Sequence, residues 1–266
     1  MDKAGQAYWE QIWIDKPVTA AVDPTDGRLA NHVDRRLHEM FVRILGPLRR
    51  EGRRLLEIGC GRSRWLPYFR THYGFAIVGV DYAPTGCDQA RAILAAAQVE
   101  GSIICADCFR PPEDLLNSFD VVWSYGVIEH FDDTSAAAAA FANYLRPGGI
   151  MITVIPNMRG LVGLLQRLAN SPVYGIHSLL TAAELAAAHR AAGLVVEEVT
   201  YFLAVNFGVI NVERPAGFRT WVARAIVGLL ARVSMAVWAL EERVTRLPAT
   251  RLLAPYIVCV ARKPST

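Results

Sequence analysis

Residues 55–63 of the chain read LLEIGCGRS, an apolar run that leads directly into a turn of small residues. The apolar run, taken over residues 54–60, predicts a strand covered on both faces, and a helix is expected next over residues 63–73. Gly59 and Gly61 allow the backbone to bend sharply and to approach a ligand closely, which a Cβ atom would block. In a doubly wound sheet this turn lies at the carboxyl edge of the strands, where ligands bind.

The same alternation of apolar runs and helical patterns extends on the C-terminal side of this segment. Further strands are predicted at residues 76–82, 102–107, 119–124, 150–155, 195–202 and 255–261, and helices at 84–98, 134–146 and 181–192. The last helix opens with a capping box, Thr181 and Glu184. Alternation of this kind is typical of βαβ units on a parallel sheet, so we predict an α/β fold with a doubly wound, mostly parallel sheet.

Four parts of the chain differ in pattern. Residues 1–50 are expected to form an N-terminal helical cap, 51–202 the ligand-binding core, 203–253 a helical insertion, and 254–266 the last core strand and tail. The stretch 157–180 is expected to be a loop or a short helix. The insertion holds the most apolar stretch, 218–240, but three arginines interrupt it. A spanning helix needs about 20 mostly apolar residues, so we expect a buried, partner-facing or interfacial helix rather than a transmembrane segment.

The composition excludes several classes of protein. Hydrophobic residues make up 53% of the 266 residues and charged residues 20%, which favours a globular chain with a large core. The formal charge is only +3 and forms no long basic run, so no nucleic-acid partner is expected. The N-terminus lacks an apolar signal segment, and five cysteines are an odd number, so we expect reduced thiols and a cytoplasmic location.

Acidic side chains follow the first three predicted strands or stand at their ends. Glu57 precedes the glycine turn, Asp81 and Tyr82 end the second strand, and Asp107 follows the third. A carboxylate about 20 residues after a glycine turn can accept both hydroxyls of a ribose. Two plainer interpretations stay open: Asp81 as a helix cap and Asp107 as a turn residue.

A dinucleotide site is disfavoured because its G-x-G-x-x-G fingerprint needs a third glycine where this chain has Arg64. No His, Asp and Glu spacing predicts a catalytic metal, and Cys105 and Cys108 form a lone C-x-x-C pair without a nearby histidine. No metal is therefore expected.

Two further motifs complete a recognisable order. Residues 119–131 read FDVVWSYGVIEHF, a buried strand that ends in an Ile-Glu-His turn, and residues 145–149 read LRPGG before the fifth strand. With the E-x-G-x-G turn and the acids after the second and third strands, the chain resembles the class I (Rossmann-like) methyltransferases that use S-adenosylmethionine (SAM), in particular the ubiquinone-biosynthesis-like O-methyltransferases. The resemblance covers about residues 53–202 and the final strand. It implies a seven-stranded sheet with an antiparallel last strand, and SAM as the cofactor.

The resemblance also implies roles for residues of this sequence. Residues near the glycine turn would line the methionine end of the cofactor, those after the second strand would hold the ribose, those after the third the adenine, and those after the fourth would form the floor beneath the sulfonium. In that order they are Glu57, Gly59, Cys60 and Gly61; Asp81 and Tyr82; Asp107 and Cys108; and Ser124, Tyr125 and Gly126. The chain departs from the family at Ser63, where a third glycine is frequent, and the bulky Arg62 and Arg64 leave the path of the loop open.

The acceptor is expected to be a small, hydrophobic metabolite methylated on a hydroxyl or an amine. A hydroxyl needs a base, and His130 and His177 are the candidates, with a capping or buried structural role as the alternative for each. Acceptor contacts are expected from residues of the variable segments, namely Tyr8, Asn157, Arg159, Tyr174 and Asn206. SAM chemistry other than methylation, or a non-catalytic partner protein of the same fold, remain alternatives. A monomer or homodimer is expected, and peripheral contact with a membrane is left open.

Overall fold

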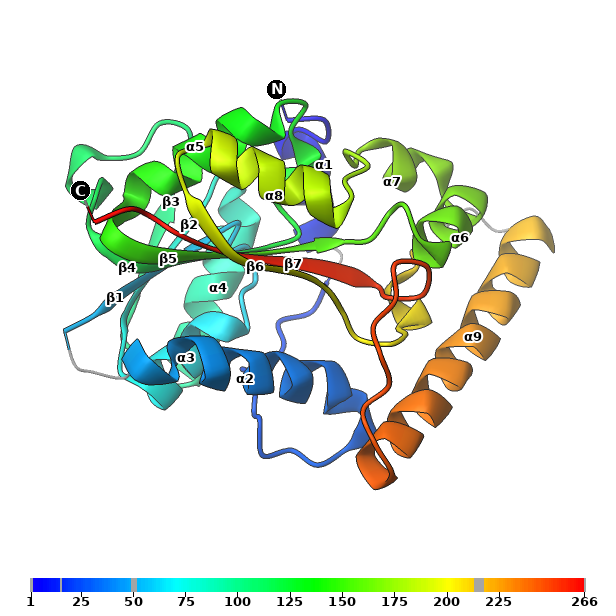
Figure 1. The fold of residues 1–266 in the computed structure, drawn as a ribbon. Helices are drawn as coiled ribbons and strands as arrows, with labels where there is room; N and C mark the ends of the chain where they lie inside the picture. Colours follow the sequence, from blue (N-terminus) through cyan, green and yellow to red (C-terminus); the bar gives the residue numbers. More distant parts are fainter. Residues whose placement is uncertain (1, 15, 49–51, 213–217, 266) are drawn as a thin grey trace.

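A computed structural model describes residues 2–14, 16–48, 52–212 and 218–265, with the side chains of residues 218 and 219 left aside (Figure 1). One seven-stranded sheet has the order β3-β2-β1-β4-β5-β7-β6. The first five strands, β1 (Arg54–Ile58), β2 (Ala76–Asp81), β3 (Ser102–Cys105), β4 (Phe119–Tyr125) and β5 (Leu145–Pro156), pair in parallel. β7 (Tyr256–Arg262) runs antiparallel between β5 and β6 (Val195–Phe202). The predicted fold class is confirmed.

Helices cover both faces of the sheet (Figure 1). One face packs against α2 (His32–Leu45), α3 (Trp65–Tyr73) and α4 (Pro84–Ala96) in a core rich in aromatic rings. Phe41 of α2 contacts Trp65 of α3 and Trp123 of β4, with ring centroids 5.2 Å and 4.9 Å away. α2 is thus part of the core layer, although the sequence placed it in an N-terminal cap.

The other face packs against α5 (Thr134–Tyr144) and α8 (Ala182–Ala191). α5 begins where the Asp133 carboxylate accepts a hydrogen bond from the Ala136 backbone N–H. α8 begins with the predicted capping box, in which Thr181 and Glu184 bond reciprocally. Both helices present small alanine side chains, so they approach the sheet closely.

Strand burial follows position in the sheet. The central strands β1, β4 and β7 are buried along almost their whole length, whereas the edge strands β3 and β6 are largely half-exposed or exposed. The strand predicted over residues 54–60 to be covered on both faces is β1, which is buried as expected. Residues 145–149, which the sequence placed before the fifth strand, are instead the first part of β5, and Leu145 pairs with Phe119 before a register shift.

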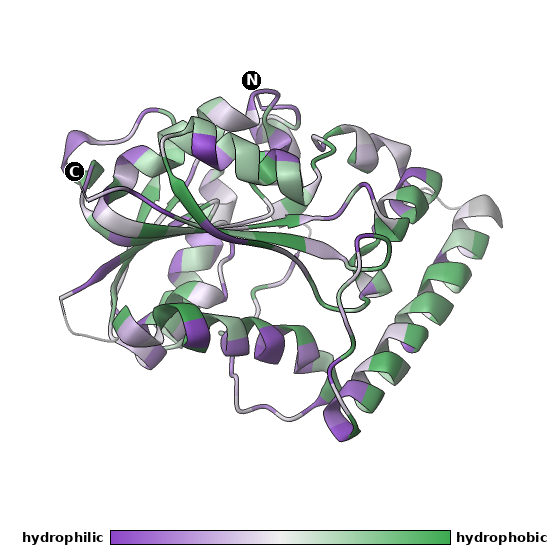
Figure 2. Cartoon of the chain, in the orientation of Figure 1, coloured by the Kyte–Doolittle hydropathy of each residue, from purple (hydrophilic) through white to green (hydrophobic). Residues whose placement is uncertain are grey.

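The segment expected to be a loop or short helix after β5 forms α6 (Leu161–Ala169) and α7 (Ser171–Gly175), and the insertion forms α9 (Phe218–Arg243). α9 leans on the rest of the fold along one side through Trp238, while most of its apolar surface is exposed (Figure 2). Its stretch Thr220–Arg243 is long and apolar enough to cross a membrane, and only 11% of it is buried. Within the described residues, 3₁₀ turns flank α2, namely η1 (Leu29–Asn31) and η2 (Gly46–Leu48), and others lie in connecting segments, namely η3 (Glu113–Leu115), η4 (Ile128–His130) and η5 (Phe207–Val209).

Candidate active site

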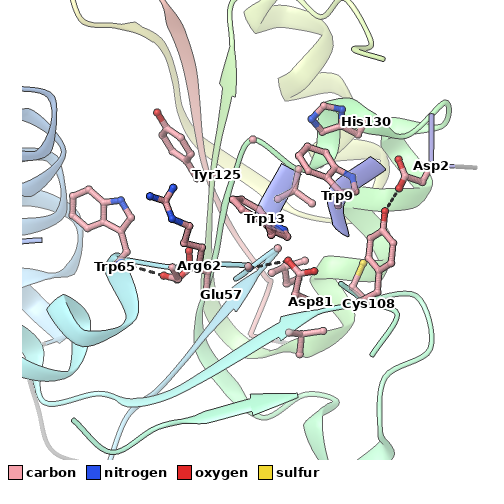
Figure 3. Close-up of a pocket in the computed structure, with 18 of the residues that line it drawn as sticks. Asp2, Trp9, Trp13, Glu57, Arg62, Trp65, Asp81, Cys108, Tyr125 and His130 are labelled. Atoms are coloured by element: carbon pink, nitrogen blue, oxygen red, sulfur yellow. Dashed lines mark hydrogen bonds between the residues drawn. The ribbon is translucent and has the colours of Figure 1, made fainter. Parts of the chain in front are cut away.

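A cavity of about 260 Å³ opens at the carboxyl edge of β1, β2 and β4 (Figure 3). Its wall combines the glycine turn after β1, the end of β2, the loop after β3, the turn after β4 and α1 (Gln6–Ile14) of the N-terminal segment. Of the residues predicted to bind the cofactor, eight line it: Glu57, Gly59, Gly61, Asp81, Tyr82, Cys108, Tyr125 and Gly126. The predicted ligand-binding edge of the sheet is thus hollow.

The glycine turn has the two properties that its sequence indicates. Gly59 has φ +74°, and a Cβ atom there would lie 2.4 Å from the Val127 side chain. At Gly61 a Cβ atom would lie 2.8 Å from the Trp13 indole nitrogen and 2.9 Å from an Asp81 carboxylate oxygen. Any side chain at these positions would therefore fill the cavity or displace its wall.

Asp81 is held by backbone amides on two sides. Its carboxylate oxygens accept hydrogen bonds from the N–H groups of Gly61 and Ala83, each at 2.8 Å. Burial raises the pKa of the Asp81 carboxyl, and these two hydrogen bonds oppose that shift. Each carboxylate oxygen has more than one acceptor position, so both can still accept a hydroxyl from a ligand in the cavity.

Glu57, at the base of the cavity, is deeply buried. One of its oxygens accepts a hydrogen bond of 2.5 Å from the Ser63 hydroxyl, which also accepts from the N–H groups of Trp65 and Leu66. Ser63 therefore begins α3 and orients Glu57, which explains a polar residue where the family often has glycine. Burial raises the pKa of Glu57 to about 8, so this carboxyl is mostly neutral at pH 7 until a cation enters the site.

We expect the stability of the ligand-free protein to fall as the pH rises from about 4.5 to about 8, because Glu57 in the folded state keeps a proton that the unfolded chain has lost. Below the ordinary pKa of 4.5 the Glu57 carboxyl is protonated in both the folded and the unfolded chain, and above about 8 it is ionised in both. Urea unfolding of Glu57→Gln across this range should show a smaller pH dependence than the unmodified chain. The exposed Glu113→Gln is the matched control, and an unchanged slope in Glu57→Gln would contradict the prediction.

The N-terminal segment covers the cavity. Trp9 and Trp13 of α1 line it, and Asp2 accepts a hydrogen bond from the Tyr82 hydroxyl (Figure 3). Gln6 donates to the Tyr82 carbonyl at 2.6 Å. Further along, Arg62 and Arg64 donate to the carbonyls of residues 17 and 20, so these bulky side chains tie the connecting loop to the glycine turn.

Three ionisable side chains meet beside the turn after β4. The His130 ring lies against Trp9 on one side and His177 on the other, with centroids 5.0 Å and 4.6 Å away. The Nδ1 atoms of His130 and His177 lie 3.0 Å and 2.6 Å from the carbonyl oxygens of Ile176 and Val173. Since a carbonyl only accepts, each Nδ1 carries the proton and each Nε2 is left with a lone pair.

Glu129 completes this group. It is 1% exposed, and both of its carboxylate oxygens lack a hydrogen-bond partner among the described residues. One of them lies 3.9 Å from Nε2 of His130. Burial raises the pKa of Glu129 to about 8 and lowers the pKa of His130 to about 4, so both side chains are mostly neutral at pH 7.

A comparison with protein families decides the relationship. The model of a family described as "Methyltransferase domain" matches residues 29–199, more than half of the chain. The chain belongs to this methyltransferase family. Membership confirms the resemblance found in the sequence, the enzyme class and, with it, SAM as the cofactor.

Individual proteins agree with this assignment. The methyltransferase is 36% identical over 110 residues to a ubiquinone biosynthesis O-methyltransferase of Mesorhizobium japonicum, covering 40% of this chain and 42% of the relative. It is 27% identical over 158 residues to a chloroplastic tocopherol O-methyltransferase of Arabidopsis thaliana, covering 55% and 45%. The alignments thus span less than half the length of these relatives. A geranyl diphosphate C-methyltransferase from Streptomyces coelicolor A3(2) shares the fold, with 13% identity, a TM-score of 0.60 and 97% of each chain covered.

Three residues predicted to bind the cofactor of this methyltransferase do not line the cavity. Cys60 is buried beneath the glycine turn, where its sulfur packs against Gly79. Ser124 is fully buried within β4. Asp107 is exposed, and its carboxylate accepts a hydrogen bond from the Phe109 N–H, which is the turn role that the sequence left open.

None of the five residues predicted to contact the acceptor lines the cavity. Asn157 is buried and donates to the carbonyls of residues 251 and 254, and Arg159 pairs with Glu184 and donates to the carbonyl of residue 179. The other three lie on α1, on α7 and before η5: Tyr8, Tyr174 and Asn206. The N-terminal helix does contribute to the cavity, but through Trp9 and Trp13 rather than Tyr8. Other aromatic and basic residues that line the cavity were not singled out from the sequence as site residues: Arg62, Arg64, Trp65 and Phe131.

Of the two histidines predicted to be catalytic, His130 lines the cavity and His177 stands behind it. The sequence separates them by 47 positions, so only the fold brings them together. The sequence does hold a signal for the N-terminal wall, because the aromatic residues Trp9 and Trp13 stand one helical turn apart, and in the structure their rings stack with centroids 6.3 Å apart.

Proposed function

We propose that this methyltransferase transfers the methyl group of SAM to a hydroxyl of a small, hydrophobic acceptor. The observation that carries the proposal is the Nε2 lone pair of His130, a neutral and oriented acceptor of hydrogen bonds, in the wall of a cavity that Trp9, Trp13 and other aromatic side chains also line. A hydroxyl that donates to this atom would be held beside the cofactor site. An amine acceptor would benefit less from a base at His130, because a neutral amine is already a nucleophile.

The residues present fit SAM. The two glycines leave a hollow that a Cβ atom would fill, and Asp81 can accept the ribose hydroxyls. Glu57 can ionise to balance the positive charge of the cofactor's methionine end. Bound SAM would supply an electrophilic methyl group, whose carbon an acceptor oxygen can attack in line with the departing sulfur.

The protein's own contribution is to align the reacting groups and to exclude water from the cavity. Trp9 and Trp13 cover the cavity and exclude water, and Gly126 leaves space at the end of β4 for the reacting groups. Fixing two reactants in a near-attack geometry can supply about 7 kcal/mol or more of the barrier. Nε2 of His130 would accept the hydroxyl proton as the acceptor oxygen takes the methyl group, with the cofactor's sulfur as the leaving group.

Incubation with SAM and candidate phenols or catechols tests the proposal. Mass spectrometry should find S-adenosylhomocysteine together with an acceptor heavier by one methylene. Formation of S-adenosylhomocysteine without that mass gain would instead favour the alternative, SAM chemistry other than methylation on the same fold.

We further propose that the acceptor is taken from a membrane surface. The supporting observation is an apolar face on α6 and α9, where Leu168 is 73% exposed and Ile226 is 50% exposed. A shallow groove runs between these helices. From residue 220 to residue 240 the only charged side chains are Arg224 and Arg232, so this stretch of α9 has a net positive charge, which suits anionic lipid.

The double substitution Leu168→Glu/Ile226→Glu should weaken binding to vesicles that contain anionic phospholipid by more than about tenfold, since it removes two side chains each worth about 1.5–3 kcal/mol when buried. Co-sedimentation measures it. Val42→Glu, at an exposed apolar position on α2, is the matched control. If the unmodified protein stays in the supernatant with such vesicles, the membrane proposal is wrong.

A further inference from the structure

Three cysteines stand around the end of β2, next to the cofactor site. Cys87 lies in the first turn of α4, directly after β2, and Cys105 ends β3, where it pairs in register with Asp81. Cys108 follows in the loop after β3 and lines the cavity. All three are free cysteines, and the proposed methyl transfer uses none of their thiols.

The partner of Cys105 differs from the one that its sequence spacing indicates. The C-x-x-C spacing would pair it with Cys108, but in the structure its thiol is hydrogen-bonded to the thiol of Cys87. The two sulfur atoms lie beside consecutive carbonyl groups: Cys87 Sγ donates to the Asp81 carbonyl at 3.3 Å, and Cys105 Sγ lies 4.0 Å from the Tyr82 carbonyl oxygen. A disulfide needs a sulfur separation of about 2.05 Å, so a shift of roughly 2 Å or less would close the pair.

The two thiols differ in their access to solvent. Cys105 is exposed and Cys87 is buried. Cys105 also ends an edge strand, which pairs on one side only, with β2. The end of β3 can therefore move toward α4 without breaking a second ladder of strand hydrogen bonds.

The charges around Cys87 confine the first reaction to Cys105. Burial, the Asp81 carboxylate and the neighbouring Cys105 thiol raise the pKa of the Cys87 thiol, and the Arg91 guanidinium opposes that shift only in part. Cys87 thus stays protonated at neutral pH and reacts poorly with an oxidant by itself, because the thiolate is the nucleophile. Arg91 also donates to the Ile103 carbonyl at 3.0 Å, which joins α4 to β3 beside the thiol pair.

We propose that hydrogen peroxide converts Cys105 and Cys87 into a reversible disulfide and that this bond weakens the binding of SAM. Cys105 sulfur attacks a peroxide oxygen, so an S–O bond forms, the O–O bond breaks, and hydroxide leaves with the thiol proton as water. Cys87 sulfur then attacks the sulfenic sulfur of Cys105. The S–S bond forms, the S–O bond breaks, and a second water carries off the Cys87 proton. The thiol pair is oxidised by two electrons, and the peroxide is reduced to two waters.

The disulfide would act on the cofactor site through the backbone of Asp81. The Asp81 carbonyl accepts hydrogen bonds from the Cys87 thiol at 3.3 Å and from the Ala106 N–H at 2.9 Å. Oxidation removes the first bond and shifts the end of β3, from which Ala106 and Cys108 continue along the cavity wall. Losing one hydrogen bond corresponds to a decrease in affinity of about two- to tenfold. By linkage, bound SAM must disfavour the disulfide by the same factor.

Peroxide treatment of the full chain, followed by alkylation of the remaining thiols and peptide mass mapping, tests the pairing. We expect a loss of two hydrogen atoms per chain, a peptide pair joined through Cys87 and Cys105, and full reversal by dithiothreitol. Cys87→Ser should stop the reaction at the sulfenic acid of Cys105, which dimedone labels.

Calorimetry with SAM on the reduced and the oxidised chain tests the consequence. The affinity of the unmodified chain should fall by about two- to tenfold on oxidation, and that of Cys105→Ser should not change with peroxide. Cys259→Ser, at a buried cysteine of β7, is the matched control and should keep the response of the unmodified chain.

A chain without the Cys87–Cys105 link after peroxide treatment, or with Cys105 joined to Cys108 instead, would overturn the proposed disulfide. A complete link with unchanged SAM affinity would overturn its effect on the cofactor site. Circular dichroism reports whether each variant folds. If Cys105→Ser does not, the unmodified chain measured before and after dithiothreitol decides, because it contains no substitution.

Discussion

Asp81→Ala should weaken SAM binding by about 1–3 kcal/mol, or roughly 5- to 150-fold, the cost of leaving buried hydroxyls without their charged partner. Asp81 is expected to contribute twice. Its carboxylate faces the cavity, and it also accepts the Gly61 N–H at 2.8 Å, which fixes the glycine turn. Removing the side chain therefore loses a ligand contact and loosens the loop that lies against the ligand.

Isothermal titration calorimetry with SAM measures the effect, and Asp81→Asn separates its two parts. The amide oxygen of Asp81→Asn can accept the Gly61 hydrogen bond, but the side chain carries no charge. The SAM affinity of this variant should therefore lie between those of the unmodified protein and Asp81→Ala. Asp88→Ala removes an exposed carboxylate of α4 and serves as control. Unchanged affinity in Asp81→Ala would exclude Asp81 from the cofactor site.

His130→Ala should reduce the turnover of acceptor methylation by about 10²–10⁴-fold while SAM affinity changes little. His130 is the histidine whose ring lines the cavity, and its free Nε2 would contact the acceptor rather than the cofactor. His177→Ala should reduce turnover less, because His177 contacts His130 but does not line the cavity.

Single-turnover kinetics with saturating SAM measures the chemical step, and calorimetry measures cofactor binding separately. His38→Ala, at a histidine that contacts Tyr68 instead, is the control. Turnover equal to that of the unmodified protein would reduce His130 to a structural residue. A matching loss of SAM affinity would mean that its removal deforms the cavity.

The sequence predicted the parts of the site that are encoded by neighbours in the chain. The glycine turn, Asp81 and the alternation of strands and helices follow from short patterns whose meaning depends on a few residues at a time. Asp107 shows the limit, because an aspartate after a strand fits a ligand contact and a turn equally well, and here it bonds to Phe109. Sequence spacing does not distinguish the two.

The residues that contact the acceptor were predicted poorly, because contacts between segments far apart in the sequence form this part of the cavity. Asn157 and Arg159 stand on the loop at the correct edge of the sheet, but their polar groups bond to the backbone of residues 251, 254 and 179. The Glu129, His130 and His177 group likewise depends on a segment that returns to the turn after β4, where Ser178 N–H donates to the Glu129 carbonyl at 2.6 Å. Neither arrangement leaves a local pattern in the sequence.

The hydrogen bonds that hold α1 over the cavity are also expected to affect the turnover rate. Gln6 donates to the Tyr82 carbonyl after β2, and Gln89 of α4 donates to the Trp13 carbonyl at 2.8 Å. Both ends of α1 are therefore hydrogen-bonded to the part of the fold formed by β2 and α4. If release of the spent cofactor requires α1 to move, these hydrogen bonds must open first, and the opening rate of the first residues would then set an upper limit on turnover. Shortening this segment is expected in that case to shorten the residence time of the cofactor.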